Sequence, residues 1–450
     1  MDTLGQERRL FSNRALFALI APLVVEQLLS ILAGLVDSIM VAAVGEAAVS
    51  GVSLIDNIMV LLIYIFSALA TGGAVVAGQY LGQKDEAQAK RAANELIWFS
   101  GLLSLAVTLV LYLGRGFILN VLFGRIEPDV YSQADIYLTI TSASVPFIAL
   151  YSAGAAVFRT MGNSRLTMYV SLLANGINIA GNAICIYGLH MGAEGVAIPT
   201  LLSRVVAAGV ILCLLARPKH VLGLERRMLR RFDGGMVRRI LTIGIPNGLE
   251  NGMFQLGKIL LLSMVSGFGT VAITANAVTN VLASFQALPG QAVGLAETTV
   301  ISRCVGAGDY EQVRHYFKKL LLVTYAVNLT GSVLVLLTVN PVLNLYHLSP
   351  ETEALTRQLL WIHTFGAVTL WALSFNQPVM FRAAGDVRFT MVISVASMWV
   401  FRLLVGWVLA TVLQLGVTGV WLAMMVDWLF RSVVFFLRYR SGKWQAFRVV

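Results

Sequence analysis

The sequence predicts an all-α polytopic membrane protein with twelve transmembrane helices in two six-helix lobes related by a parallel internal repeat. Three observations predict it: the composition, the placement of basic residues and a repeat between the halves. Of the 450 residues, 58% are hydrophobic and only 12% are charged, whereas a soluble globular chain carries roughly twice that charged fraction. The composition therefore excludes a disordered chain, a coiled coil and an ordinary cytosolic enzyme.

Long apolar runs separated by polar breaks predict the individual helices in order. Each run is close to the roughly 20 apolar residues that a spanning helix needs. Spanning strands are excluded because an open sheet would leave backbone groups unpaired in lipid. The expected helices are 15–44, 50–79, 93–114, 136–158, 167–188, 194–216, 239–266, 271–302, 319–339, 357–381, 389–413 and 417–438.

The basic residues orient the chain. Of its 33 lysines and arginines, 27 fall in or beside alternate loops, the 382–388 loop among them, or in the tail from Arg431. Three fall in or beside the opposite loops, and three, Arg204, Lys258 and Arg402, fall deep inside expected helices. Because cytoplasmic loops carry the excess of lysine and arginine, both termini are expected in the cytoplasm and the chain in the cytoplasmic membrane. This asymmetry accounts for the net charge of +10, so the chain needs no nucleic-acid partner.

A repeat with an offset of 224 residues relates the two halves. Pro22 corresponds to Pro246, and Gly45 corresponds to Gly269. Each half has six expected helices, an even number, so both halves share one orientation in the membrane. Two repeated bundles of this kind are typical of a transporter.

The repeat and the charge pattern together predict the domain organisation. The N-terminal lobe comprises residues 1–216 and the C-terminal lobe residues 239–450. Residues 217–238, which are strongly basic and contain proline and glycine, form a cytoplasmic linker between them.

Four segments resemble the multidrug and toxic compound extrusion (MATE) transporters. Residues 22–45 (PLVVEQLLSILAGLVDSIMVAAVG) resemble the first helix of that family, and residues 244–257 (GIPNGLENGMFQLG) resemble its seventh. The loop 79–85 (QYLGQKD) and its counterpart 304–309 (CVGAGD) also match. The resemblance covers nearly the whole chain, and it implies export of amphipathic, often cationic compounds in exchange for a cation.

Four polar side chains are expected at similar depth in the outer half of the N-terminal lobe. Asp37 lies about 12 Å below the outer end of its helix, Asn178 and Asn182 about 15 and 9 Å, and Thr200 about 8 Å. Asn178 and Asn182 are four residues apart and share a helix face. One carboxylate with neutral oxygen ligands suits a monovalent cation or a titrating proton.

These positions match the first-lobe cation site of the resembled family, which implies Na⁺ held by Asp37, Asn178 and Asn182, or H⁺ as the coupling ion. Some members have a second aspartate where this chain has Asn182, so a two-carboxylate proton site is in doubt and a sodium site is favoured. Two alternatives stay open: Asp37 as a buried partner of Arg204, and the neutral residues as hydrogen bonds between helices. The corresponding residues of the second lobe are Leu261, Arg402, Gly406 and Met424.

Further polar and aromatic residues are candidates for a substrate or second-lobe polar site. Glu250 is expected in the inner half of its helix, where it meets a cationic substrate or an internal hydrogen-bond donor. The expected helix 357–381 contains no acidic residue, which disfavours a second-lobe sodium site. Pro22 and Pro246 are expected to bend their helices. The other candidates are Lys258, Glu26, Met253 and Phe285.

We therefore expect a secondary active antiporter that exports amphipathic organic compounds in exchange for H⁺ or Na⁺. Its partners are a small organic substrate and the lipid bilayer, with no cofactor, no obligate protein partner and a monomeric state. The absence of HExxH, GxSxG and P-loop motifs argues against an enzyme or an ATP-driven exporter. The alternatives are a flippase for lipid-linked oligosaccharides, which belongs to the wider superfamily, and a passive channel or receptor.

Overall fold

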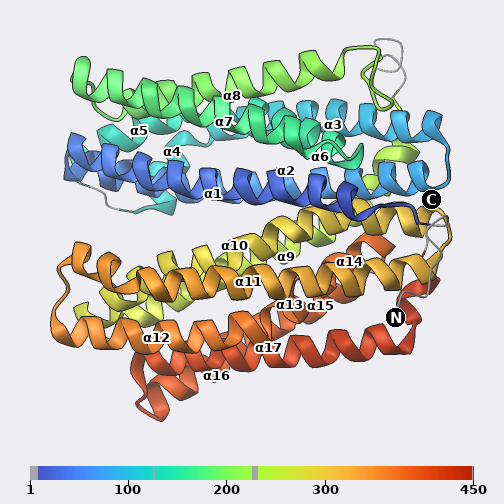
Figure 1. The fold of residues 1–450 in the computed structure, drawn as a ribbon. Coiled ribbons are helices and arrows are strands. Elements are labelled where there is room, and N and C mark those ends of the chain that lie inside the picture. Colours follow the sequence, from blue (N-terminus) through green and yellow to red (C-terminus); the bar gives the residue numbers. More distant parts are fainter. Residues whose placement is uncertain (1–8, 125–126, 226–231, 448) are drawn as a thin grey trace. The chain divides into compact units, whose positions relative to one another are not determined.

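The computed structural model describes residues 9–124, 127–225, 232–447 and 449–450. Several basic residues counted for the orientation lie outside these ranges: Arg8, Arg125, Arg226, Arg227, Arg230, Arg231 and Arg448. Within the described ranges every regular element is a helix, as predicted (Figure 1). The first ten elements are α1 (Asn13–Val44), α2 (Glu46–Gly82), α3 (Glu86–Leu113), α4 (Arg115–Phe117), η2 (Ile118–Leu122), α5 (Pro128–Ser142), α6 (Val145–Thr160), α7 (Ser164–Ala183), η3 (Ile184–Gly188) and α8 (Glu194–Leu215).

The remaining elements follow in the same pattern of long helices and short connections. They are α9 (Gly234–Ser266), α10 (Thr270–Gly306), α11 (Tyr310–Tyr346), α12 (Pro350–Thr369), α13 (Trp371–Phe375), α14 (Gln377–Ala384), α15 (Val387–Ser397), η5 (Met398–Leu404), α16 (Val405–Trp407), η6 (Val408–Val412), α17 (Gly416–Ser441) and η7 (Lys443–Ala446).

The number of spans agrees with the sequence. Among the described residues, nine helices are long and apolar enough to cross a membrane, and two bent helix pairs bring the number to eleven. The remaining long helix is α9, whose 33 residues extend over about 50 Å. Its polar residues, among them Glu250 and Lys258, lower its hydropathy. With α9 the chain has twelve spanning helices.

Two expected helices are broken, which corrects their description as continuous spans. Residues 136–158 fall into α5 and α6, bent by 46°, and residues 357–381 fall into α12 and α13–α14, bent by 68°. Pro146, at the start of α6, lacks an N–H and its ring crowds the preceding turn, which explains the first break. At the second break the Leu370 carbonyl accepts a hydrogen bond from the Ser432 hydroxyl at 3.2 Å, in addition to one from the backbone N–H of Ser374 at 3.0 Å.

The loop motifs 79–85 and 304–309 of the two halves fold alike. Asp85 accepts from the backbone N–H of Gln88 at 3.0 Å and caps α3, and Asp309 caps α11 through Gln312 at the same distance. Side-chain capping of this kind stabilises a helix start by about 1 kcal/mol. In the preceding turn one residue adopts the left-handed backbone conformation. It is Gly308 (φ 70) in one half and Lys84 (φ 62) in the other.

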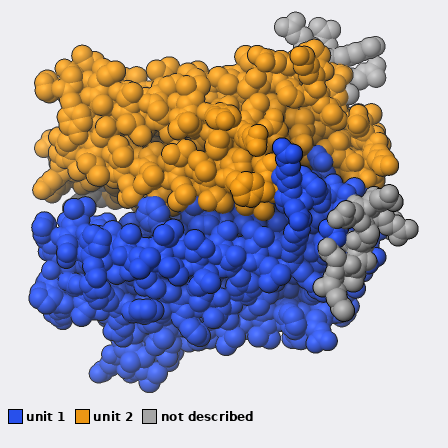
Figure 2. All heavy atoms as spheres, viewed as in Figure 1, with its two compact units in different colours: residues 1–16, 249–450 blue, residues 17–248 orange. Residues whose placement is uncertain are grey.

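The described residues form two compact units, coloured separately in Figure 2. The N-terminal unit is Phe17–Gly248, and the C-terminal unit holds Leu249–Val450 with the described residues before Phe17. The start of α9 belongs to the N-terminal unit: a Cβ added at Gly72 of α2 would lie 2.5 Å from the Ile240 carbonyl oxygen. Division into lobes 1–216 and 239–450 with a linker at 217–238 stays a prediction drawn from the repeat.

The two prolines expected to bend helices lie inside continuous ones. α1 runs through Pro22 and α9 runs through Pro246 without interruption. Each proline removes one helical hydrogen bond. Their role as bending points stays a prediction.

Candidate functional site: an acidic cavity in the N-terminal unit

A cavity of about 470 Å³ lies inside the N-terminal unit, lined by residues of α1, α2, α5, α6, α7 and α8. We call it the acidic cavity. Asp37 of α1 and Asp56 of α2 line it, together with one cation, Arg204 of α8. Asn178 of α7 and Thr200 of α8 are also in its wall. The consecutive helices α1 and α2 thus supply the two acidic groups of the cavity, and the distant α8 supplies the cation.

The carboxylate of Asp37 forms a hydrogen bond with a side chain of α7. The side-chain amide of Asn182 donates a hydrogen bond to Oδ1 of Asp37. Asn182 is fully buried, and its own Oδ1 has no hydrogen-bond partner. A buried acceptor without a donor is unfavourable, so this oxygen is available as a ligand for a cation.

The second pair of expected ligands is also in contact. Nδ2 of Asn178 donates to Oγ1 of Thr200 at 3.0 Å. Close approach of the two helices makes this contact feasible, because a Cβ added at Gly181 of α7 would lie 2.6 Å from Cβ of Pro199 in α8. The structure therefore places the four predicted residues in two hydrogen-bonded pairs, and their role in cation binding stays a prediction.

Asp56 was absent from the predicted site, although it shares the cavity with Asp37. Its Oδ1 accepts a hydrogen bond from the Tyr137 hydroxyl at 2.9 Å. The sequence held a signal: Asp56 lies ten residues after Glu46, where α2 starts. It is therefore about 15 Å from that end of the helix, close to the corresponding distance of Asp37.

Arg204 supplies the opposite charge without forming a direct ion pair with Asp37 among the described residues. Its guanidinium donates to the Ser144 hydroxyl at 2.7 Å, and both aspartates lie within its electrostatic range. With both carboxylates ionised, Asp37, Asp56 and Arg204 leave one net negative charge in the cavity. Uptake of one monovalent cation neutralises it.

The other predicted polar residues are engaged elsewhere. Glu26 is buried and accepts from the Thr167 hydroxyl at 2.9 Å, outside the cavity lining. Glu250 is buried in the C-terminal unit and forms an ion pair with Arg382 at 3.2 Å. Phe285 packs against an apolar cluster of α10, α11 and α12. Met253 is partly buried in α9.

The donor set of the acidic cavity does not suit a transition metal. No group of three or more histidine, cysteine, aspartate or glutamate side chains is close enough for a metal ion in the part of the chain that the structure describes. A transition-metal site needs such a group. One carboxylate with neutral oxygens, including the unsatisfied Oδ1 of Asn182, fits a monovalent cation better.

The chain matches the MatE family model twice, over residues 22–184 and 246–408. The two matches begin at the prolines of α1 and α9, and their starts are 224 residues apart, which confirms the internal repeat. Together they cover more than half of the chain.

Curated relatives and solved structures agree with the family match. An uncharacterized transporter, YisQ of Bacillus subtilis, is 27% identical over 96% of this chain and 94% of its own length. A probable multidrug resistance protein, NorM of Thermotoga maritima, is 25% identical over 96% and 93%. A solved MATE family transporter in an outward-facing conformation has a TM-score of 0.90 at 19% identity, over 96% of both chains, and so shares the fold. The chain belongs to the MatE family, the multidrug and toxic compound extrusion transporters.

Proposed function

We propose that this transporter is a secondary antiporter that exports amphipathic, cationic organic compounds in exchange for H⁺ or Na⁺. The observation that carries the proposal is the acidic cavity, where Asp37 and Asp56 face Arg204 inside a single unit and leave one net negative charge when both carboxylates are ionised. An ionisable group at membrane depth is costly and marks an ion pathway by default. The multidrug resistance name of the Thermotoga maritima relative supports the cargo class.

The coupling step is built on Asp37 and its contacts. Without a cation, the Asn182 amide N–H₂ satisfies one oxygen of Asp37. An amide presents two donors on one side and an acceptor on the other, so rotation of Asn182 turns its unpaired oxygen towards a cation beside Asp37. Asn178 and Thr200 supply neutral oxygens from α7 and α8.

The membrane potential supplies the driving force. One elementary charge that moves across 100 mV releases about 2.3 kcal/mol. Because 1.4 kcal/mol is a factor of ten in concentration, this supports a cargo gradient of roughly fifty-fold. The proposal needs no cofactor and no protein partner, and a monomer in the cytoplasmic membrane suffices.

Transport by purified protein in liposomes tests the proposal. A fluorescent amphipathic cation is supplied while a pH gradient and a sodium gradient are imposed separately. Cation movement that follows one of the gradients supports antiport and names the coupling ion. Movement that needs neither gradient would indicate a passive channel, and transfer of a lipid-linked oligosaccharide in place of the dye would indicate a flippase.

The proposed orientation, with both termini cytoplasmic, is tested by labelling single cysteines in a variant without the native ones. Glu46 and Thr270 are equivalent in the repeat and start α2 and α10, so cysteines at both positions should react with an impermeant thiol reagent from outside. Cysteines at Gln83 and Gly234 should react only after permeabilisation, because the basic loops face the cytoplasm. The reverse pattern would overturn the orientation.

A further inference from the structure

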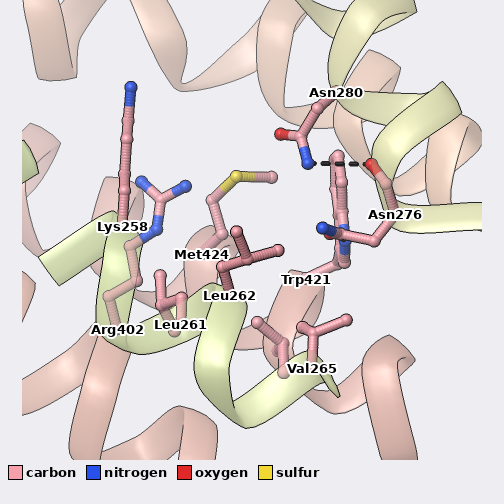
Figure 3. Close-up of a pocket in the computed structure, with 10 residues that line it drawn as sticks. Lys258, Leu261, Leu262, Val265, Asn276, Asn280, Arg402, Trp421 and Met424 are labelled. Carbon is pink, nitrogen blue, oxygen red and sulfur yellow. Dashed lines mark hydrogen bonds between the residues drawn. The ribbon is translucent and has the colours of Figure 1, made fainter. Parts of the chain in front are cut away.

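A second pocket, which we call the basic pocket, lies inside the C-terminal unit between α9, α10, η5 and α17 and has a volume of about 240 Å³. Lys258 and Arg402 line it, and no carboxylate does. Figure 3 shows their cationic ends on one side of the pocket and Asn276, Asn280 and Trp421 on the other. The pocket thus faces its occupant with two cations and two amides.

The basic pocket is the counterpart of the acidic cavity in the repeat. Five of its lining residues lie 224 positions after lining residues of the acidic cavity. Both aspartates of the acidic cavity are replaced by neutral residues, and two neutral residues are replaced by cations. The pairs are Gly34 with Lys258, Asp37 with Leu261, Asp56 with Asn280, Asn178 with Arg402, and Thr200 with Met424.

The two cations of the basic pocket are weakly compensated. Lys258 is exposed and lies 5.7 Å from the ring centroid of Phe254; it makes no ion pair or hydrogen bond with any other described residue. Arg402 lies 5.5 Å from the same ring and 3.7 Å from Oδ2 of the buried Asp427. That distance exceeds the usual length of a charge-assisted hydrogen bond, about 2.7–2.9 Å.

Neighbouring groups do not cancel this charge. The buried Arg431 is a third cation at Phe254, 5.8 Å from the ring centroid, and it shares Asp427 with Arg402. The Arg382–Glu250 pair balances itself at 3.2 Å. A cation in a membrane-spanning helix without a counter-charge is unfavourable, so the site favours an anion from outside the chain.

We propose that the basic pocket binds the anionic group, a carboxylate or a phosphate, of an amphipathic compound. Lys258 and Arg402 pair with the anion. The Trp421 indole N–H donates to Oδ1 of Asn276 at 3.0 Å, which leaves the Nδ2 donors of Asn276 for the same anion. The apolar side chains of Leu261, Leu262 and Met424 line the pocket beside them and contact the body of the compound.

The size of the pocket fits this assignment. Its volume is about 240 Å³. Drug-sized ligands occupy pockets of about 300–1,000 Å³. The basic pocket therefore holds the charged end of a compound, and the apolar remainder lies outside it.

Binding at equilibrium tests the proposal without any ion gradient, so a failure of antiport would not affect the result. The transporter is placed in nanodiscs of phosphatidylcholine, and a dansyl-labelled undecanoate serves as the probe, with protein-free nanodiscs as the reference. Lys258→Gln should weaken binding about tenfold because it removes the uncompensated cation. Lys258→Arg should restore it, and Lys318→Gln, on the exposed surface of α11, should leave it unchanged.

A second variant tests the proposal even if Lys258→Gln does not fold. Asn280→Asp places a carboxylate opposite the two cations and should weaken probe binding at least as much, while size exclusion and thermal unfolding report on the fold of every variant. Displacement of the probe by phosphatidylglycerol in the nanodisc would assign the pocket to a lipid headgroup, and its absence would assign it to a free organic acid. Unchanged probe binding by folded Lys258→Gln or Asn280→Asp, or equal binding of tetraphenylphosphonium at the pocket, would overturn the proposal.

Discussion

The acidic cavity and the basic pocket occupy the same place in two copies of one fold, and they differ in the sign of their charge. In the N-terminal unit Asp37 and Asp56 face one arginine, whereas in the C-terminal unit Lys258 and Arg402 face no carboxylate in the pocket wall. The position of the cavity is the same in both units because the repeat gives them the same helix packing. A few substitutions inside that packing then decide which ion the cavity attracts.

The two sites also differ in how their polar atoms are satisfied. In the acidic cavity Asn182 binds Asp37 and keeps one buried oxygen without a partner. Its repeat counterpart in the C-terminal unit is Gly406, which offers no ligand. A coupling site is therefore expected in one unit only, and substitutions at Asp37, Asp56 and Asn182 test that expectation.

The largest effect is expected from Asp37→Asn. Loss of this carboxylate should reduce gradient-driven efflux roughly a hundredfold, the upper end of the 1–3 kcal/mol typical of coupling free energies. Dye efflux from proteoliposomes under the coupling gradient measures it. Leu261→Asn, at the equivalent position of the C-terminal unit, is the matched control and should affect packing alone. If both folded variants lost coupling equally, the assignment of coupling to one unit would be wrong.

A smaller effect is expected from Asp56→Asn. Without Asp56, the charges of Asp37 and Arg204 balance, and the cavity no longer attracts a cation by its net charge. We expect the affinity for the coupling ion to fall about tenfold, or about 1.4 kcal/mol, as measured by efflux against the concentration of that ion. Tyr137→Phe removes the hydrogen bond to Asp56 but keeps the charge, so it should change the affinity little. An equal effect of both substitutions would assign Asp56 to packing.

Substitutions of Asn182 sharpen the comparison further. Asn182→Asp places a second carboxylate beside Asp37, and because nearby like charges disfavour double ionisation, the pH optimum of transport should shift upward. Asn182→Leu removes a ligand and should weaken sodium activation several-fold. Transport rate against pH at fixed sodium, and against sodium at fixed pH, measures both. Two unchanged curves would remove Asn182 from the site.

The smallest effect, on stability alone, is expected at a glycine shared by both units. A Cβ at Gly419 would lie 2.7 Å from the backbone nitrogen of Ala410, whereas at Gly195 the nearest atom is Cβ of Met191 at 2.9 Å. Met191 belongs to a loop, which yields more easily than a helix backbone. Gly419→Ala should therefore cost about 1–3 kcal/mol and lower the melting temperature more than Gly195→Ala. The opposite order would show that η6 yields more easily than that loop.

Sequence reasoning also placed some charges incorrectly. Arg382 and Arg431 were counted with cytoplasmic loop residues, but they lie in α14 and α17, Arg382 paired with Glu250 and Arg431 buried. Hydropathy locates the end of a spanning helix only approximately. It does not show whether a long basic side chain near that end points back into the core of the protein. The prediction of one helix over 136–158 and one over 357–381 missed the bend in each, because a local break does not change the apolar composition.

The sequence by itself determined the class of molecule, its helices and its repeat, because these follow from local composition and from the correspondence of residues such as Pro22 and Pro246. It also determined that Asp37 lies at membrane depth, since helical rise converts sequence distance into depth. Only the tertiary structure decided that Asp56 lines the same cavity as Asp37, and that Lys258 and Arg402 share a pocket. The rotation and tilt of each helix decide which side chains converge, and these depend on packing between segments far apart in the chain.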